Sequence, residues 1–317
     1  MAQTVKSLNA LAVVLERPGQ LTLRSLPLPD PGAEDAVVDM LWSGISTGTE
    51  RLLWSGAMPP FPGMGYPLVP GYESVGRVVL AGERSQRRAG EHVFVPGARC
   101  YGAVRGLFGG AASRVVVPGA RLLPVDERLG ERAVLMALAA TAYHAVHAGE
   151  LPQLIVGHGV LGRLVARLCV LAGVRPVVWE SDPARREACT EYAVVDPGQD
   201  DRHDYASVCD VSGDASLLDT LVQRLAPGGE IVLAGFYSER LSFAFPPAFM
   251  REARLRVAAE WKPADLAAVT ALAASGALCL DGLITHRRDA SQAHEAYRTA
   301  FEDSRCLKMI LDWRTCG

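Results

Sequence analysis

A glycine-rich turn between an apolar strand and an apolar helix constrains the fold of this chain most. The strand Leu154–Val156 leads into Gly-x-Gly-x-x-Gly at Gly157, Gly159 and Gly162, and an apolar helical run follows. A second apolar strand then ends in Glu180, 18 residues after Gly162 (180 minus 162). This is the order that a dinucleotide-binding βαβ unit requires, whereas an ordinary βα turn needs none of the flanking elements.

Each residue of this turn has a separate physical role. Gly157 allows a sharp turn, Gly159 lets the backbone approach a pyrophosphate, and Gly162 lets the helix lie close to the strand. The helix begins at Val160 and Leu161, where unpaired N–H groups and a partial positive charge favour phosphate. We therefore predict that these five residues bind a dinucleotide cofactor.

The acid at the end of the second strand, Glu180, predicts a preference for NAD over NADP. Its carboxylate accepts hydrogen bonds from ribose hydroxyl groups and repels a 2′-phosphate. Asp182 and Pro183 begin the next helix, with Asp182 as its cap. Arg185 and Arg186 oppose the NAD prediction, because one turn of helix can bring an arginine to that phosphate.

Later strand ends add candidates to the cofactor site. The strands that we predict in this half are 153–157, 175–180, 193–195, 207–211 and 229–234. A doubly wound sheet receives its ligand at the carboxyl ends of its strands. Ser212 and Gly235 follow two of these ends directly, so we include both in the cofactor site.

The rest of the chain follows two different patterns. Residues 1–135 are rich in Pro and Gly, with short apolar runs such as Ala36–Met40 and Arg114–Val117. Short strands between turn signals predict a β-barrel or sandwich. From residue 131 onwards, helices alternate with strands, which predicts a parallel sheet. After a helical stretch from Pro263, the last predicted strand is Leu307–Leu311.

Composition predicts a two-domain folded protein without a nucleic-acid partner. The chain has 317 residues, of which 49% are hydrophobic and 21% charged, and a net charge of -3. That charge offers no basic surface to nucleic acid. The longest apolar run, Leu266–Leu280, is too short and interrupted to span a bilayer, and we find no signal-peptide pattern. Seven cysteines without a Cys-x-x-Cys pair predict free thiols in the cytoplasm.

Four segments resemble the medium-chain dehydrogenase/reductase superfamily over nearly the whole chain. They are Ser43–Ser46, Pro70–Gly76, Thr141–Tyr143 and Leu280–His286. The resemblance implies an α/β protein with an N-terminal GroES-like β-barrel, a doubly wound parallel Rossmann sheet and a C-terminal return to the barrel. It implies a catalytic domain of residues 1–139 and 261–317 and an NAD-binding domain of residues 140–260.

The chain departs from this superfamily at the catalytic zinc. The resemblance places Ser46, Tyr72 and Ala137 where the zinc-containing members have Cys, His and Cys. Serine and tyrosine are neutral or largely neutral at pH 7, and alanine has no donor atom, whereas zinc prefers thiolate, imidazole or carboxylate. Only Cys100 lies in the region of the four-cysteine structural zinc site. We therefore predict a metal-free member.

A further resemblance suggests the substrate. The segment Gly56–Glu73, and Ser46–Glu50 before it, resemble zinc-free dehydrogenases of bacteriochlorophyll biosynthesis, which oxidise a 3-(1-hydroxyethyl) group to 3-acetyl. This implies an NAD-dependent alcohol dehydrogenase with a bacteriochlorophyllide-like tetrapyrrole substrate, and it allows a homodimer. Trp54, Phe61 and Tyr66 offer flat apolar surfaces to such a ligand, or else their loop packs on its own barrel.

Without zinc, a protein group must take the alcohol proton while the cofactor takes the hydride. Tyr72 is our first candidate, but its ordinary pKa near 10 requires a nearby positive charge, such as the nicotinamide ring. Ser46, Thr49 and Glu73 complete a relay. Alternatively, Tyr72 only lines the pocket and Glu73 only accepts backbone N–H groups. Lys308 either lies near the cofactor phosphates, as the superfamily resemblance implies, or is an ordinary exposed strand lysine.

Two other functions stay open at this point. One is a zinc-free reductase of quinones or enones, or of a natural-product pathway. The other is a non-catalytic NAD-binding protein, since all three zinc ligands are lost. The intact glycine motif and the remaining hydroxyl and carboxylate groups argue against this last alternative.

Overall fold

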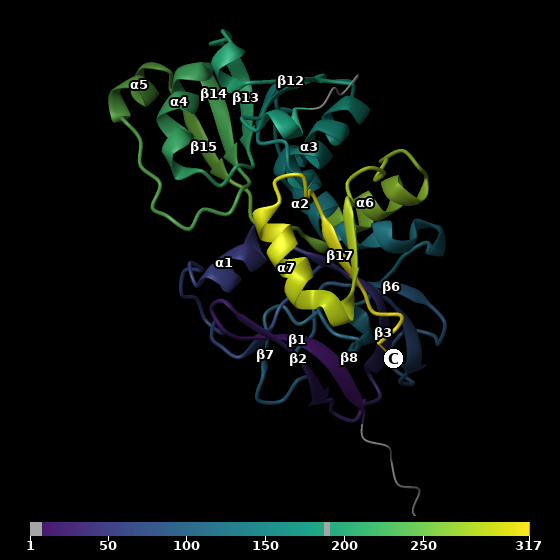
Figure 1. The fold of residues 1–317 in the computed structure, drawn as a ribbon. Coiled ribbons are helices and arrows are strands. Elements are labelled where there is room, and N and C mark those ends of the chain that lie inside the picture. Colours follow the sequence, from purple (N-terminus) through teal and green to yellow (C-terminus); the bar gives the residue numbers. More distant parts are fainter. Residues whose placement is uncertain (1–7, 187–190, 317) are drawn as a thin grey trace, which may run out of the picture. The chain divides into compact units, whose positions relative to one another are not determined.

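The computed structural model describes residues 8–186 and 191–316, and the chain forms two units (Figure 1). The first unit comprises residues 1–136 and 281–317, and the second comprises residues 137–280. The second unit is longer than the predicted 140–260 because helix α6 (Pro263–Ala274) belongs to it. Asp265 Oδ2 of α6 lies 2.9 Å from His144 Nδ1, and Arg167 donates to the carbonyl of Cys279 at 2.8 Å.

The second unit is built on a parallel sheet with the strand order β12-β11-β10-β13-β14-β15. Its strands are β10 (Leu154–Val156), β11 (Val177–Trp179), β12 (Ala193–Val195), β13 (Tyr205–Asp210), β14 (Leu225–Leu233) and β15 (Arg254–Val257). Its other helices and turns are α2 (Met136–His147), α3 (Val160–Leu171), η3 (Pro183–Arg185), η4 (Pro197–Gln199), η5 (Ala215–Leu217), α4 (Leu218–Arg224) and α5 (Phe245–Met250). This strand order is that of a doubly wound dinucleotide-binding sheet, which confirms the predicted fold class.

The first unit contains two sheets. The larger has the order β16-β17-β3-β5-β6-β9, with β8 also paired to β3, and the smaller has the order β2-β1-β4-β7. The strands are β1 (Asn9–Arg17), β2 (Gln20–Pro27), β3 (Asp35–Ile45), β4 (Leu68–Val69), β5 (Ser74–Ala81), β6 (His92–Val95), β7 (Arg105–Gly106), β8 (Arg114–Pro118), β9 (Leu123–Pro124), β16 (His286–Asp289) and β17 (Met309–Asp312). The helices and turns are α1 (Thr49–Ser55), η1 (Gly119–Arg121), η2 (Glu127–Leu135), η6 (Ala290–Gln292) and α7 (Ala293–Glu302).

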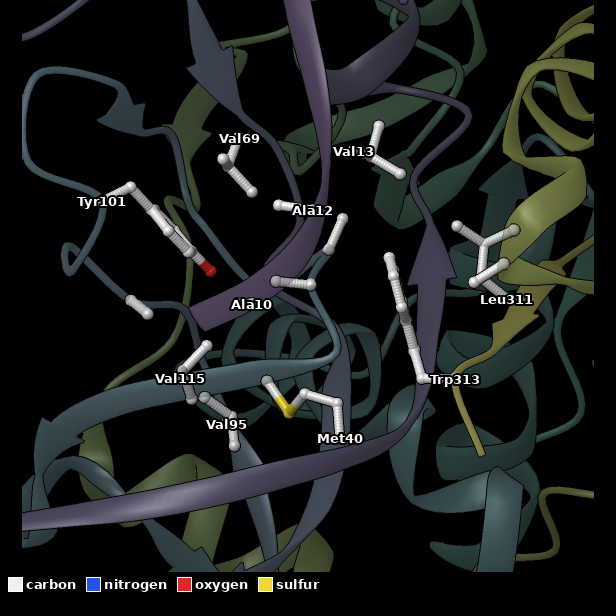
Figure 2. Close-up of a cluster of buried hydrophobic side chains, with 14 of the residues drawn as sticks. Ala10, Ala12, Val13, Met40, Val69, Val95, Tyr101, Val115, Leu311 and Trp313 are labelled. Atoms are coloured by element: carbon white, nitrogen blue, oxygen red, sulfur yellow. The ribbon is translucent and has the colours of Figure 1, made fainter. Parts of the chain in front are cut away.

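The C-terminal return is part of the core of the first unit. β17 pairs antiparallel with β3, and α7 packs beside β17 (Figure 1). Figure 2 shows Leu311 and Trp313 in the same buried cluster as Val13 and Met40. The indole N–H of Trp313 donates to Ser43 Oγ at 2.9 Å. Because removing a fully buried large aromatic side chain typically costs about 3–5 kcal/mol, the return stabilises the barrel.

Two predictions about composition can be compared with this fold. No helix within the two described ranges is long and apolar enough to cross a membrane. The six cysteines that the structure describes are free thiols, as predicted, and four of them are buried. Cys189 lies outside the described residues.

Candidate active site

Three hydroxyl groups meet in the first unit, where β3 ends and α1 begins. Tyr72 Oη lies 2.9 Å from Ser46 Oγ and 3.4 Å from Thr49 Oγ1. An edge-to-face contact with Phe108, with ring centroids 5.4 Å apart, orients the tyrosine ring. The structure thus brings together three of the four side chains that we predict to be catalytic.

The surroundings of Tyr72 favour a neutral phenol. Burial raises the pKa of Tyr72 far above its usual value, and the nearby carboxylates of Glu73 and Glu50 add to this shift. The hydrogen bonds with Ser46 and Thr49 lower the pKa only in part. The phenol is therefore suited to donating, accepting or relaying a proton, but not to acting as a resting phenolate.

Glu73 and Lys308 form a buried ion pair behind this cluster. Lys308 Nζ lies 2.5 Å from Glu73 Oε2 and also donates to the carbonyl of Ile45 at 3.2 Å. Both side chains are almost completely buried. The interpretation of Lys308 as an exposed strand lysine is therefore wrong, because its ammonium group is enclosed by protein. Its observed partners, Glu73 and Ile45, also give no support to the predicted phosphate contact.

Two glycines make room for this arrangement. A Cβ atom on Gly44 would lie 2.6 Å from Glu73 Oε2, so any larger residue would displace the carboxylate. Gly71, which precedes Tyr72, has φ of 99° and would place a Cβ atom 2.9 Å from the backbone N of Ala111. The two glycines lie in two of the four segments on which the superfamily resemblance depends, Ser43–Ser46 and Pro70–Gly76.

The sequence prediction missed Glu50. Its Oε1 accepts the N–H of Ser46 at 3.1 Å, and its Oε2 accepts the hydroxyl of Tyr297 at 2.6 Å. Burial raises the pKa of Glu50 to about 7, and the charge of Glu73 adds to the shift. Glu50 thus ties α7 to the turn that carries Ser46. Tyr297 lies 247 residues further along the chain, so no local pattern links the two.

The three residues that we predict to bind substrate have different environments. Trp54 lies in α1, not in a loop, and its ring contacts His294 and Phe301, with centroids 6.2 Å away in each case. The hydroxyl of Tyr66 donates to the carbonyl of Leu53 at 2.5 Å. Phe61 is 38% exposed. Trp54 and Tyr66 are partly buried and pack within the first unit, and Phe61 is the most exposed of the three.

The glycine turn of the second unit has the geometry that its residue types require. Gly157 has φ of 105°, and a Cβ atom on Gly162 would lie 1.9 Å from the carbonyl oxygen of Gly157. By contrast, a Cβ atom on Gly159 would meet no atom within 4 Å. This open space adjoins the start of α3 at Val160 and Leu161, where backbone N–H groups are available to an anion.

Glu180 lies at the end of β11 and is fixed by backbone groups. Its carboxylate accepts the N–H of His158 at 3.2 Å and the N–H of Asp182 at 2.9 Å. Asp182 caps the following 3-10 turn by accepting the N–H of Ala184, which confirms its predicted role as a cap. Arg186 donates to Asp196 Oδ2 at 2.5 Å and to the carbonyl of Glu180 at 3.1 Å. Those bonds restrain one of the two arginines that oppose an NAD preference.

Ser212 and Gly235 lie at the carboxyl ends of β13 and β14. Ser212 donates to Asp210 Oδ1 from both its hydroxyl, at 2.6 Å, and its backbone N–H, at 2.9 Å. A Cβ atom on Gly235 would lie 2.7 Å from the backbone N of Gly213. The two loops are therefore in close contact at the edge of the sheet where a ligand is expected.

The three residues that the superfamily resemblance assigns to the zinc ligand positions offer few donors. Ser46 and Tyr72 carry hydroxyl groups that bind each other, and Ala137 is buried in α2. Across residues 8–186 and 191–316, no group of three or more His, Cys, Asp or Glu side chains is placed to hold a metal ion.

Known proteins share this fold. Residues 32–127 match the alcohol dehydrogenase GroES-like domain family. A crystal structure of a short chain alcohol dehydrogenase from Escherichia coli CFT073, complexed with NADH, has a TM-score of 0.83 and 22% sequence identity, and covers 96% of this chain and 99% of that chain. With its GroES-like domain and Rossmann-type sheet, the protein is a medium-chain dehydrogenase/reductase.

Two relatives define the family more closely, and both are named 2-desacetyl-2-hydroxyethyl bacteriochlorophyllide A dehydrogenase. The protein from Rhodobacter capsulatus is 58% identical over 306 residues, which are 95% of this chain and 98% of that protein. The protein from Cereibacter sphaeroides is 56% identical over 316 residues, 97% of this chain and 99% of that protein. The chain belongs to this family of bacteriochlorophyllide dehydrogenases.

Proposed function

We propose that this chain oxidises the hydroxyethyl side chain of a bacteriochlorophyllide to an acetyl group, with NAD and without zinc. The observation that carries the proposal is the cluster of Tyr72, Ser46 and Thr49 hydroxyl groups. The superfamily resemblance implies a metal at this position in zinc-containing members, and the chain is 58% identical to a relative named for this substrate. The identity supports the substrate, and the hydroxyl cluster supports a metal-free reaction.

The second unit has groups suited to NAD. The space beside Gly159 and the start of α3 suit a pyrophosphate, while the Glu180 carboxylate suits ribose hydroxyl groups. Ser212 and Gly235 lie at neighbouring strand ends. When bound, the cofactor supplies the hydride acceptor.

The hydroxyl cluster handles the proton. Oxidation breaks the C–H bond of the carbinol carbon, whose hydride goes to the cofactor, and breaks the O–H bond, whose proton goes to Tyr72. Because the pKa of Tyr72 is raised by burial, we propose that Tyr72 gives up its own proton to Ser46 or Thr49 as it accepts the substrate proton. The hydroxyl group that receives this proton releases its own proton to water, so no oxygen atom of the relay becomes charged. Tyr72 stays neutral in this relay, and the buried Glu73–Lys308 pair holds the adjoining backbone.

The reaction as proposed does not use zinc. Ser46 and Tyr72 supply hydroxyl oxygens, and Ala137 supplies none, so these positions lack the donors that catalytic zinc prefers. Transfer of the alcohol proton to Tyr72 takes the place of the metal, because it prevents full negative charge from building up on the substrate oxygen.

One experiment tests the reaction. Purified protein is incubated with hydroxyethyl bacteriochlorophyllide and NAD, and both the pigment and NADH absorbance are followed. We expect a red shift, since a new acetyl group is conjugated with the macrocycle, and an equal amount of NADH. Activity should persist in a strong chelator, and elemental analysis should find no stoichiometric zinc.

The outcomes separate the alternatives. One tightly bound metal ion per chain, with activity lost on its removal, would contradict the metal-free mechanism but not the substrate. Reduction of quinones or enones without pigment oxidation would favour the reductase alternative. NAD binding without turnover of either substrate class would favour a non-catalytic protein.

We also propose that the chain forms a homodimer through the second unit. Seven large apolar side chains between residues 236 and 257 are 40–77% exposed: Phe236, Phe243, Phe245, Phe249, Met250, Leu255 and Val257. An aromatic side chain has roughly 150–250 Å² of surface. At the exposed fractions given above, the seven side chains together expose on the order of 700 Å² to solvent. That is close to the roughly 800 Å² per partner of a standard stable interface.

The edge of the sheet supports a second copy of this chain as the partner. β15 ends the strand order and pairs with β14 alone within the described ranges. Edge strands usually avoid pairing by presenting charges to solvent. Here Arg254 donates to the carbonyl of Gly228 at 3.0 Å, and Arg256 donates to that of Ala145 at 2.7 Å. The guanidinium groups of both arginines are therefore hydrogen-bonded within their own unit.

We also place the dimer in the cytoplasm, which is consistent with the free thiols of the described cysteines.

A further inference from the structure

His158 stands between the first two glycines of the cofactor turn, and its side chain is completely buried. Its ring Nδ1 lies 2.8 Å from the carbonyl oxygen of Arg185, and its ring Nε2 lies 3.0 Å from the hydroxyl of Tyr192. Its ring also meets that of Tyr192 edge to face, with centroids 5.7 Å apart. The glycine motif does not specify the residue between its first two glycines. Here that residue is a histidine whose ring contacts Arg185 and Tyr192, which follow Glu180 in the chain.

The backbone of His158 is held as well. Its N–H donates to Glu180 Oε2 at 3.2 Å, and its carbonyl accepts from Arg163 Nε at 3.1 Å. Arg163 also donates to the carbonyl of Arg185, at 3.4 Å. Every polar atom of His158 therefore has a partner, and these partners connect the glycine turn to Glu180 and to Arg185.

The contacts determine the tautomer of the ring. Burial lowers the pKa of His158, so the ring is neutral. A carbonyl oxygen can only accept, so Nδ1 must carry the proton that is donated to Arg185. Nε2 is then unprotonated and accepts the hydroxyl proton of Tyr192. Only the neutral tautomer with its proton on Nδ1 satisfies both hydrogen bonds, and the two bonds together fix the orientation of the ring.

We infer that His158 is a positioning residue that sets the discrimination of this chain between NAD and NADP. The inference rests on the proposed cofactor site, where Glu180 meets the ribose hydroxyl groups. His158 fixes both sides of that choice, because its backbone holds the Glu180 carboxylate while its ring holds the backbone of Arg185. The side chain of Arg185 is one of the two that a 2′-phosphate would attract.

Removing the His158 ring loosens the backbone of Arg185 more than it loosens the Glu180 carboxylate. The Glu180 carboxylate keeps both of its backbone donors, the N–H groups of positions 158 and 182, because a substitution leaves the main chain in place. The carbonyl of Arg185 loses its 2.8 Å hydrogen bond with the His158 ring and keeps the longer one, 3.4 Å, with Arg163. The backbone of Arg185 therefore gains freedom, and its guanidinium group can follow a 2′-phosphate. The loosened segment beside Glu180 should reduce the affinity for both nucleotides, and the contact of Arg185 with a 2′-phosphate should offset part of that loss for NADPH alone. Loss of His158 should therefore lower the affinity for NADH more than the affinity for NADPH.

The test measures the dissociation constants of NADH and NADPH by fluorescence titration of the full-length protein. For His158→Ala we expect NADH affinity to fall about tenfold, as a lost buried hydrogen bond with unpaired partners implies. We expect NADPH affinity to fall less, so that the ratio of the two constants changes several-fold. His158→Asn, whose amide can replace the Nδ1 donor, should recover much of the discrimination, and Tyr192→Phe should change it only slightly.

A matched control is His144→Asn, since His144 binds Asp265 away from the glycine turn. It should leave both dissociation constants unchanged. If His158→Ala weakens NADH and NADPH by the same factor, or changes neither, His158 is only a packing residue and the inference fails. If His158→Ala does not fold, His158→Phe, which keeps an aromatic ring but removes the Nδ1 donor to Arg185, takes its place with the same expected outcomes. Wild-type protein that binds neither nucleotide would instead contradict the proposed cofactor site itself.

Discussion

At the scale of single residues, the candidate site gathers the hydroxyl groups of Tyr72, Ser46 and Thr49 within hydrogen-bonding distance. The phenol of Tyr72 has carboxylates nearby, and these raise its pKa beyond the effect of burial. A phenol in such a place is a poor base on its own, but it is well suited to passing a proton between oxygen atoms. Glu50, whose pKa of about 7 lies within the physiological range, supports the same turn through the N–H of Ser46.

The first prediction concerns Tyr72→Phe. We expect turnover to fall by about 10²–10⁴, because general acid–base assistance is typically worth that much. NADH affinity should be almost unchanged, since the groups proposed to hold the cofactor lie in the second unit. Steady-state kinetics and a fluorescence titration measure the two effects. The control is Tyr143→Phe, which removes the hydroxyl group from a ring stacked on His147 in α2. Normal turnover in Tyr72→Phe would show that Tyr72 only lines the pocket.

The second prediction concerns Glu180. We expect the wild-type protein to prefer NAD, because Glu180 repels a 2′-phosphate and Arg186 is restrained by Asp196. Glu180→Gln should bring the values of kcat/KM for NAD and NADP closer together by at least about tenfold, since the negative charge is removed. Equal efficiency with both cofactors in the wild type would show that the arginines outweigh the acid.

At the scale of elements, two return segments complete the first unit. β17 adds to β3, and α7 supplies Tyr297 to Glu50. The sequence could predict the strand at 307–311 from its apolar residues, but not the partners of Lys308 or Tyr297. Those partners depend on contacts between residues more than 230 positions apart, which periodicity and spacing do not encode. β15 was also missed, because four residues that alternate arginine with leucine and valine are too short a pattern.

The third prediction concerns the buried ion pair that joins the segments before β5 and β17. Lys308→Met should lower the free energy of unfolding by about 3–5 kcal/mol, because it leaves the Glu73 carboxylate buried without its partner. Adding Glu73→Gln should restore much of that loss. Urea denaturation provides the measurement. Arg287→Met, which breaks the exposed pair with Glu131, should cost no more than about 1 kcal/mol, and equal losses for both single variants would contradict the argument.

The fourth prediction separates two aromatic residues around α1. Trp54→Ala should lower the thermal unfolding temperature, because the ring packs on His294 and Phe301 of the C-terminal return. Phe61→Ala should leave that temperature unchanged and raise the Michaelis constant for bacteriochlorophyllide several-fold, because the ring is exposed. An unchanged Michaelis constant in Phe61→Ala would remove Phe61 from the substrate site.

At the scale of the whole molecule, the sequence predicted the main features of the fold because each has a local signal. Glycine spacing marked the dinucleotide-binding sheet, and short strands between turn residues marked the barrel. The limits of the second unit were harder to predict. Nothing in the local pattern of α6 shows that Asp265 binds His144, 121 residues earlier, and that contact helps keep α6 in the second unit.

The last prediction concerns assembly. With a chain mass of 33.9 kDa, light scattering after size exclusion should give about 68 kDa (twice 33.9) for the wild type. A charge placed in an apolar interface must be desolvated without a partner, which costs several kcal/mol. Phe249→Asp on α5 and Val257→Arg on β15 should therefore each shift the mass towards that of one chain.

Leu171→Arg is the matched control for this experiment. Leu171 is 45% exposed and belongs to the same unit, but it lies at the end of α3, outside residues 236–257. It should leave the mass at about 68 kDa (twice 33.9). A wild-type mass of one chain at all concentrations would contradict the dimer. If the Leu171→Arg variant also dissociates, the effects of the other two variants do not locate the interface on α5 and β15. Two-fold pairing of β15 edges would then have no support.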